Sequence, residues 1–198
     1  MRRLIHALLL AAAAGSLPAF AALEQGATAP VFTAQASLAG KEFTFALKDA
    51  LKKGPVVVYF YPSAFTGGCN IQAHTFAEDM DKFKAAGSTV IGVSLDSITR
   101  LNAFSADPQY CAGKLPVASD ADGSIAKSYQ LKVMEGHPGI KDTRGQDIDH
   151  GFAERTTFVI TPDGKVAATI GGLAPADNVA KTLETVQQLH GGKAKAAT

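Results

Sequence analysis

The chain is poor in the residues that form disulfides or bind metals. Its 198 residues include no tryptophan, three methionines and only two cysteines, Cys69 and Cys111. Two cysteines cannot build a disulfide framework, and a chain of this length buries enough apolar surface to fold without one. The cysteines do not follow C-x2-C or C-x3-C spacing, and the histidines show no ligand-like spacing. The sequence therefore predicts no metal site.

An excess of charge of either sign is also missing. The 19 Lys and Arg residues nearly balance the 18 Asp and Glu residues, which gives a formal net charge of +1 at pH 7. Proteins that bind phosphate backbones usually carry a basic patch or stripe, and none is visible here. We therefore expect no nucleic-acid partner.

A long apolar run occurs only at the N-terminus. Residues 1–3 are Met-Arg-Arg, residues 4–14 are apolar, and residues 19–21 read Ala-Phe-Ala. A charged start, an apolar stretch too short to span a bilayer and an A-x-A site are typical of a secretory signal peptide. We expect residues 1–21 to be cleaved, which predicts a periplasmic protein without stable membrane insertion. An uncleaved membrane anchor is the alternative.

The rest of the chain alternates between strand-like and helix-like patterns. Residues 56–61 form an apolar run without polar alternation, as in a central strand covered on both faces. The other expected strands are 42–45, 89–95, 115–118, 156–160 and 166–170, the last two joined by a hairpin turn at 161–164. Expected helices are 69–86, 98–106, 125–129 and 175–189.

This order predicts an α/β fold, with a central mixed β-sheet flanked by helices, in one domain over residues 22–190. Residues 132–153 contain glycines, a proline and mixed charges without periodicity, so we interpret them as a surface loop. Residues 191–198 are small and basic, and we expect a disordered tail.

The most informative segment follows the apolar run 56–61. It reads Pro62-Ser-Ala-Phe-Thr66-Gly-Gly-Cys69, a P-x3-T-x2-C pattern, and helical spacing begins directly after it. Cys69 is thus expected in the first turn of a helix. The unpaired backbone N–H groups and the positive end of the helix dipole favour an anion there, so this thiol should act as a thiolate nucleophile.

The P-x3-T-x2-C pattern after a buried strand resembles the active-site motif of the peroxiredoxins. Residues 154–164, with an arginine before a strand and a Pro-Asp-Gly turn, are similar to another segment of that family, and residues 115–120 resemble its middle segment. The resemblance covers residues 27–189 and is strongest to the bacterioferritin comigratory protein, or Q-type, branch. It implies a thioredoxin-like fold.

The resemblance also implies a thiol-dependent peroxidase without a bound cofactor, which reduces hydrogen peroxide or organic hydroperoxides. Cys69 would be the peroxidatic cysteine and form a sulfenic acid. Thr66 would offer its hydroxyl to the thiolate and the peroxide, Arg155 would stabilise negative charge, and Pro62 would shield the site from water. A thioredoxin-like protein or a small thiol would be the reductant, and we expect a monomer or homodimer.

Each of these residues also has a simpler interpretation. Cys69 would be an inert buried thiol or half of a static disulfide, and Thr66 a turn or cap hydroxyl. Pro62 would only end the strand. Arg155 would form a surface ion pair with Glu154 or Asp149.

The sequence departs from the Q-type pattern at the position five residues after Cys69. Many members have their resolving cysteine there, but this chain has His74, so Cys111 is the only internal candidate. An external thiol acting on Cys69 alone is the alternative. The usual glutamate three residues after the cysteine is replaced by Gln72, and Gly67-Gly68 stands in a turn that often contains proline and glycine.

Two other functions remain possible from the sequence. A thiol-disulfide oxidoreductase would use the same fold, but Gln72 occupies the position of the second cysteine of C-x2-C. A non-enzymatic domain with a static disulfide between Cys69 and Cys111 is the third hypothesis.

Overall fold

Seven strands form one mixed sheet in the order β2-β1-β5-β4-β3-β8-β9. The computed structural model describes residues 22–196, with side chains through residue 192, so the predicted signal peptide lies outside the described residues. The strands are β1 (Thr33–Leu38), β2 (Lys41–Ala46), β3 (Val56–Phe60), β4 (Thr89–Ser94), β5 (Val117–Ser119), β6 (Val133–Met134), β7 (Phe152–Ala153), β8 (Thr156–Ile160) and β9 (Val166–Gly171). The helices are α1 (Leu47–Leu51), α2 (Gly67–Ala85), α3 (Ile98–Ala106), α4 (Ser124–Ser128) and α5 (Pro175–Ala196).

Strand β3 lies inside the sheet, and all of its residues are buried. It pairs in parallel with β4 and antiparallel with β8, which makes the sheet mixed as predicted. Its side chains alternate between two apolar cores, because successive residues of a strand point to opposite faces. Val56, Val58 and Phe60 belong to one core, and Val57 and Tyr59 belong to the other.

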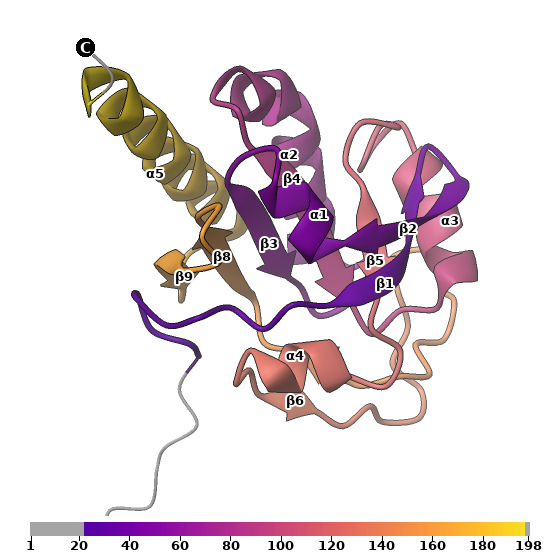
Figure 1. Ribbon diagram of the computed structural model, residues 1–198. Coiled ribbons are helices and arrows are strands. Elements are labelled where there is room, and N and C mark those ends of the chain that lie inside the picture. Colours follow the sequence, from indigo (N-terminus) through magenta and orange to yellow (C-terminus); the bar gives the residue numbers. More distant parts are fainter. Residues whose placement is uncertain (1–21, 197–198) are drawn as a thin grey trace, which may run out of the picture.

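The larger helices cover the face that carries Tyr59. Buried side chains of α2, α3 and α5 share that core, whereas α1 and α4 contribute to the core on the opposite face. Figure 1 shows α5 beside α2, with β8 and β9 near the start of α5. This arrangement brings the start of α2 close to residues at the start of β8, which are distant in sequence.

Several predicted elements are confirmed with small shifts at their ends. The helix after residue 97 is α3, and the Ser97 hydroxyl accepts a hydrogen bond from Arg100 N, as in an N-cap. The predicted hairpin forms from β8 and β9. The predicted strand at 115–118 is β5, which begins at Val117.

The sequence missed β1 and α1. β1 reads TAQASL, and alanine and serine give no strand signal of their own. The strand exists because its neighbours complete its hydrogen bonds, with Ala36 opposite both Phe43 and Ala118. The segment 47–51 is a single helical turn, too short for a periodic pattern.

Two other segments differ from the expectation. Residues 132–153 are not wholly a loop, since β6 and β7 pair as a separate two-stranded sheet that closes the segment at its ends. Helix α5 continues through 191–196, where a disordered tail was expected. Alanine and lysine favour helix, and each glycine costs only about 1 kcal/mol relative to alanine. Residues 197–198 lie outside the described residues.

Candidate active site

Cys69 lies in the first turn of α2, as the sequence predicts. The helix begins at Gly67 with Thr66 as its N-cap residue, and the backbone N–H of Asn70 donates to the Thr66 carbonyl at 2.8 Å. Cys69 is 2% exposed and belongs to the core that contains Tyr59. A thiolate at this position faces the positive end of a 19-residue helix, which favours its charge.

Arg155 directly contacts the Cys69 sulfur. Its Nη2 lies 3.3 Å from Cys69 Sγ, and its Nη1 donates to Gln72 Oε1. The contact arises because β3 and β8 are antiparallel, with Phe60 opposite Thr156, so the end of β3 and the start of β8 lie together. The two residues are 86 positions apart in sequence.

A chain of buried amides holds this arginine. Gln72 Nε2 donates to Asn178 Oδ1 at 3.0 Å, and the Thr157 hydroxyl donates to the same oxygen at 2.7 Å. Asn178 Nδ2 in turn donates to the Ile170 carbonyl at 3.0 Å. Gln72, Thr157 and Asn178 are all fully or almost fully buried. The network orients the guanidinium without neutralising its charge, because an amide carries none.

The alternative of an ordinary surface ion pair does not describe this arginine. Within residues 22–192, no carboxylate lies within ion-pair distance of Arg155. Its positive charge is therefore available to an anion at Cys69. The sequence analysis did not identify Asn178 as a site residue. The signal available was an asparagine beside Val179 on the apolar face of a helix, which indicates a buried polar contact.

Thr66 and Pro62 belong to the turn between β3 and α2. The Thr66 hydroxyl donates to the Ser63 carbonyl at 2.8 Å, and it makes no side-chain cap bond to the helix. Its lone pairs remain free to accept a hydrogen bond. Pro62 is half-buried where the chain leaves β3. Thus Thr66, Cys69 and Arg155 lie at the start of α2, and Pro62 lies in the turn that leads to it.

The segment 132–153 reaches this site, which the sequence did not indicate. Phe65 has a left-handed backbone with φ of 61°, an unusual conformation for a bulky residue. Its carbonyl accepts from both the backbone N–H and the hydroxyl of Thr143, each at 2.9 Å. Arg144 covers the Phe65 ring, with its guanidinium carbon 3.1 Å from the ring centroid. These contacts stabilise the strained turn before Thr66.

Cys111 lies in the same core as Cys69 and is fully buried. Both thiols are free in this structure. Burial raises the pKa of Cys111 well above its ordinary value, with a smaller contribution from Asp107, so Cys111 is a neutral thiol here. Ala112, the next residue, has a left-handed backbone with φ of 52°. Cys111 thus occupies a tight turn after α3.

The structure gives no indication of a metal centre or a membrane-spanning helix in the part of the chain that it describes. No three His, Cys, Asp or Glu side chains there are grouped so that they could hold a metal ion. None of the described helices combines the length and the apolar character that crossing a bilayer requires.

A substitution at Gly68 tests whether the Arg155 position matters. A Cβ atom at Gly68 would lie 3.1 Å from Arg155 Nη2 and 3.4 Å from Pro175 Cγ, so we expect Gly68→Ala to displace the guanidinium from Cys69. The rate constant for Cys69 oxidation by hydrogen peroxide should fall roughly 10-fold, since misplacement by 1 Å can cost up to about 100-fold. Quenched-flow mass spectrometry would measure this rate.

Gly67→Ala is the matched control, because a Cβ at Gly67 meets no atom within 4 Å. Both substitutions remove a glycine from the first turn and should stabilise it by up to about 1 kcal/mol. Equal rates in the two variants would mean that the arginine position is not critical.

Comparisons with known proteins identify the family of this chain. Residues 25–169 match the AhpC/TSA family. The chain is 32% identical to the chloroplastic peroxiredoxin Q of Sedum lineare, over 86% of this chain and 81% of the relative. It is 31% identical to a putative peroxiredoxin bcp of Coxiella burnetii, over 74% of this chain and 87% of the relative.

Solved structures give the same result. The crystal structure of peroxidoxin BcpB from Mycobacterium tuberculosis superimposes with a TM-score of 0.69 and 28% identity, covering 84% of this chain and 97% of the other. The predicted thioredoxin-like fold and the Q-type resemblance are therefore confirmed. Because the family match covers most of the chain and the relatives are peroxiredoxins, this chain belongs to the AhpC/TSA family of peroxiredoxins, which are thiol-dependent peroxidases.

Proposed function

We propose that Cys69 is the peroxidatic nucleophile of this protein. Its thiolate attacks one oxygen of a peroxide, the O–O bond breaks, and the leaving oxygen takes up a proton as water or an alcohol. The sulfur is oxidised to a sulfenic acid. The observation that carries the proposal is the 3.3 Å contact between Arg155 Nη2 and Cys69 Sγ in the first turn of α2.

Arg155 has two tasks in this scheme. Its charge stabilises the thiolate before the reaction, and it stabilises the negative charge that develops on the leaving oxygen. Gln72 accepts a hydrogen bond from the second nitrogen of the same guanidinium, so the arginine need not reorganise during the reaction. Such preorganised charge is usually the largest contribution to catalysis in a site of this type.

Thr66 and Pro62 have supporting roles in the proposal. The Thr66 hydroxyl donates to the Ser63 carbonyl, so its oxygen can accept a hydrogen bond from the peroxide. Rotation of the hydroxyl about the Cβ–Oγ1 bond would let it donate to the peroxide instead. Pro62 has no N–H group and is half-buried beside the turn, where it reduces access of water to the sulfur.

We further propose that Cys111 resolves the sulfenic acid. Its thiol attacks the Cys69 sulfur, and a disulfide and water form. Both cysteines are buried, so each segment must open first. Gly67 and Gly68 in the first turn of α2 and the left-handed Ala112 beside Cys111 favour such opening, because glycine freedom and backbone strain lower its cost.

Cys111→Ser tests this step. We expect one equivalent of hydrogen peroxide to form an intramolecular disulfide in the wild type, seen by intact mass as the loss of two hydrogens. In Cys111→Ser the same treatment should leave a sulfenic acid on Cys69, seen as a gain of one oxygen or as its dimedone adduct. Wild-type protein that accumulates sulfenic acid without a disulfide would instead support a one-cysteine cycle with an external thiol.

The remaining features of the cycle are proposals from the sequence. The A-x-A site after the apolar run supports cleavage after Ala21 and a periplasmic location. A thioredoxin-like protein or a small thiol of that compartment would reduce the oxidised enzyme. A monomer or homodimer remains our prediction for the oligomeric state.

A further inference from the structure

A buried carboxylate lies beneath the turn that leads to Cys69. Asp96 follows β4, and its side chain is fully buried. Asp96 Oδ2 accepts from Ala64 N at 2.7 Å and from the Ser94 hydroxyl at 2.6 Å, and Oδ1 accepts from the Ser63 hydroxyl at 3.0 Å. Ser63 and Ala64 lie between Pro62 and Thr66, so Asp96 fixes the turn that carries the active-site motif.

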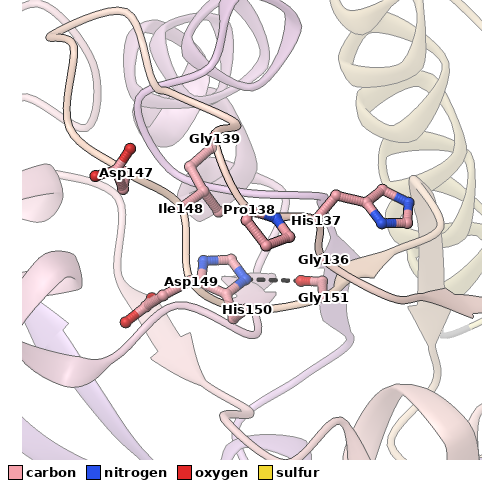
Figure 2. Close-up of a pocket in the computed structure, with 9 residues that line it drawn as sticks. All are labelled: Gly136, His137, Pro138, Gly139, Asp147, Ile148, Asp149, His150 and Gly151. Atoms are coloured by element: carbon pink, nitrogen blue, oxygen red, sulfur yellow. Dashed lines mark hydrogen bonds between the residues drawn. The ribbon is translucent and has the colours of Figure 1, made fainter.

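His150 completes this arrangement from the segment 132–153. Its Nε2 lies 2.8 Å from Asp96 Oδ1, and its Nδ1 lies 2.7 Å from the Gly151 carbonyl oxygen. Figure 2 shows the second of these bonds at the wall of an open pocket of about 690 Å³. A carbonyl and an ionised carboxylate only accept, so with Asp96 ionised both ring nitrogens donate in these contacts, as in the imidazolium form of His150. The Ser63 hydroxyl also lies 3.4 Å from Nε2.

The electrostatics agree with that protonation state. Burial opposes the charge of His150, but the hydrogen bond and charge of Asp96 outweigh it, so the pKa of His150 is raised. Burial likewise opposes the charge of Asp96, but bonds from His150, Ser94 and Ala64 outweigh it, so the pKa of Asp96 is lowered. The two directions are mutually consistent, since each partner favours the charge of the other.

Other charged groups surround the pair. Arg100 of α3 lies 2.8 Å from Asp96 and 2.8 Å from Asp142, its Nη2 also donates to the Ala64 carbonyl, and its charge disfavours that of His150. The remaining titratable groups near His150 line the same pocket and are His137, Asp147 and Asp149. Asp96 therefore keeps one cation, Arg100, whatever the state of His150, and Arg100 also links it to Asp142 of the segment 132–153. Only the direct bond between Asp96 and His150 depends on the proton.

We propose that protonated His150 and Asp96 form a positioning pair for the peroxidase reaction, holding Ser63 and Ala64 so that Thr66 and Cys69 are correctly placed. Ser63 is the direct connection, because its carbonyl accepts the Thr66 hydroxyl while its own hydroxyl donates to Asp96. Loss of the His150 proton breaks either the bond to Asp96 or the bond to Gly151. The turn is then held less firmly, and Cys69 reacts more slowly.

The expected pH dependence follows from the direction of each shift. A raised histidine pKa means that the contribution of the pair is complete below the ordinary histidine value and is lost as the pH rises through the raised value. A lowered aspartate pKa means that the contribution is present above the ordinary aspartate value and is lost only as the pH falls through the lowered one. The pair should therefore hold the turn between the ordinary aspartate and histidine pKa values and release it as the pH rises through the raised pKa of His150.

His150→Gln tests the proposal through the rate of Cys69 oxidation by hydrogen peroxide as a function of pH. In the wild type, loss of the His150 proton should give a falling limb. In His150→Gln we expect a rate roughly 10-fold lower at pH values below that limb and no falling limb, because glutamine neither carries charge nor titrates. His137→Gln is the matched control, since His137 lines the same pocket but is exposed, and it should keep the wild-type profile.

A falling limb with an unchanged midpoint in His150→Gln would overturn the proposal. A second measurement does not depend on whether the His150→Gln variant folds. The imidazole resonances of His150 in isotope-labelled wild-type protein should titrate at the midpoint of the falling limb, and in Asp96→Asn the His150 midpoint should move to lower pH. An NMR midpoint that differs from the kinetic one would equally contradict the positioning role.

The inference rests on the proposed role of Cys69, but the two fail in different ways. If Cys69 is not the nucleophile, hydrogen peroxide leaves its thiol unmodified at every pH. If only the positioning role is wrong, Cys69 is oxidised in both proteins with parallel pH profiles.

Discussion

Cys69→Ser should abolish peroxide consumption, with a loss of about 10⁴-fold or more, as for removal of other covalent nucleophiles. A serine hydroxyl in the first turn of α2 does not ionise near neutral pH, even beside Arg155, and it cannot form a sulfenic acid. Hydrogen peroxide consumption with dithiothreitol as the reductant would measure the effect. The substitution changes one buried atom, so the thermal midpoint of unfolding should stay close to that of the wild type.

Cys111→Ser is the control for this experiment. Dithiothreitol can reduce the Cys69 sulfenic acid directly, so Cys111→Ser should retain peroxidase activity in the same assay. The two variants separate the attacking cysteine from the resolving one. Substantial peroxidase activity in folded Cys69→Ser would contradict our assignment and favour the hypothesis that Cys69 has no catalytic role.

Arg155→Met should lower the rate constant for Cys69 oxidation by about 10²- to 10³-fold, the usual cost of removing one preorganised donor from a site where negative charge develops. Methionine fills a similar volume but offers neither the charge nor the bond to the sulfur. Stopped-flow or quenched-flow measurement with hydrogen peroxide would give the rate constant directly.

Arg155→Lys should recover only part of this loss. The guanidinium reaches Cys69 and Gln72 at the same time through two different nitrogens, whereas an ammonium is a single point charge. Lys165→Met removes a charge from the exposed turn of the β8–β9 hairpin and is the matched control, with an expected rate equal to that of the wild type. A rate for Arg155→Met as high as that of Lys165→Met would remove the arginine from the mechanism.

The local features of the fold could be predicted from the sequence. The buried run that became β3, the helix that became α2 and the position of Cys69 in its first turn all follow from patterns within residues 56–85. The P-x3-T-x2-C segment carried the resemblance to peroxiredoxins, and the family match confirms it. Such features are local because hydrogen-bond periodicity and helix-end chemistry depend on neighbours in the chain.

Elements without a pattern of their own could not be predicted. β1 depends on pairing with β2 and β5, and its small residues carry no signal. The segment 132–153 has no periodicity, yet its Thr143 contacts the turn that precedes Cys69, and its His150 contacts Asp96, which holds that turn. Their roles depend on contacts across the fold, which a single sequence does not specify.

By itself, the sequence predicted that Cys69 lies in the first turn of a helix after a buried strand, and most of the larger strands and helices around it, because these depend on neighbouring residues. Arg155 was named from a family resemblance, but only the antiparallel register of β3 and β8 places its guanidinium against the sulfur. The tertiary structure alone decided that Gln72 and Asn178 hold this arginine and that Asp96 and His150 hold the turn. The physical reason is that buried polar groups need partners, and in a folded chain those partners come from whichever segments the packing brings together.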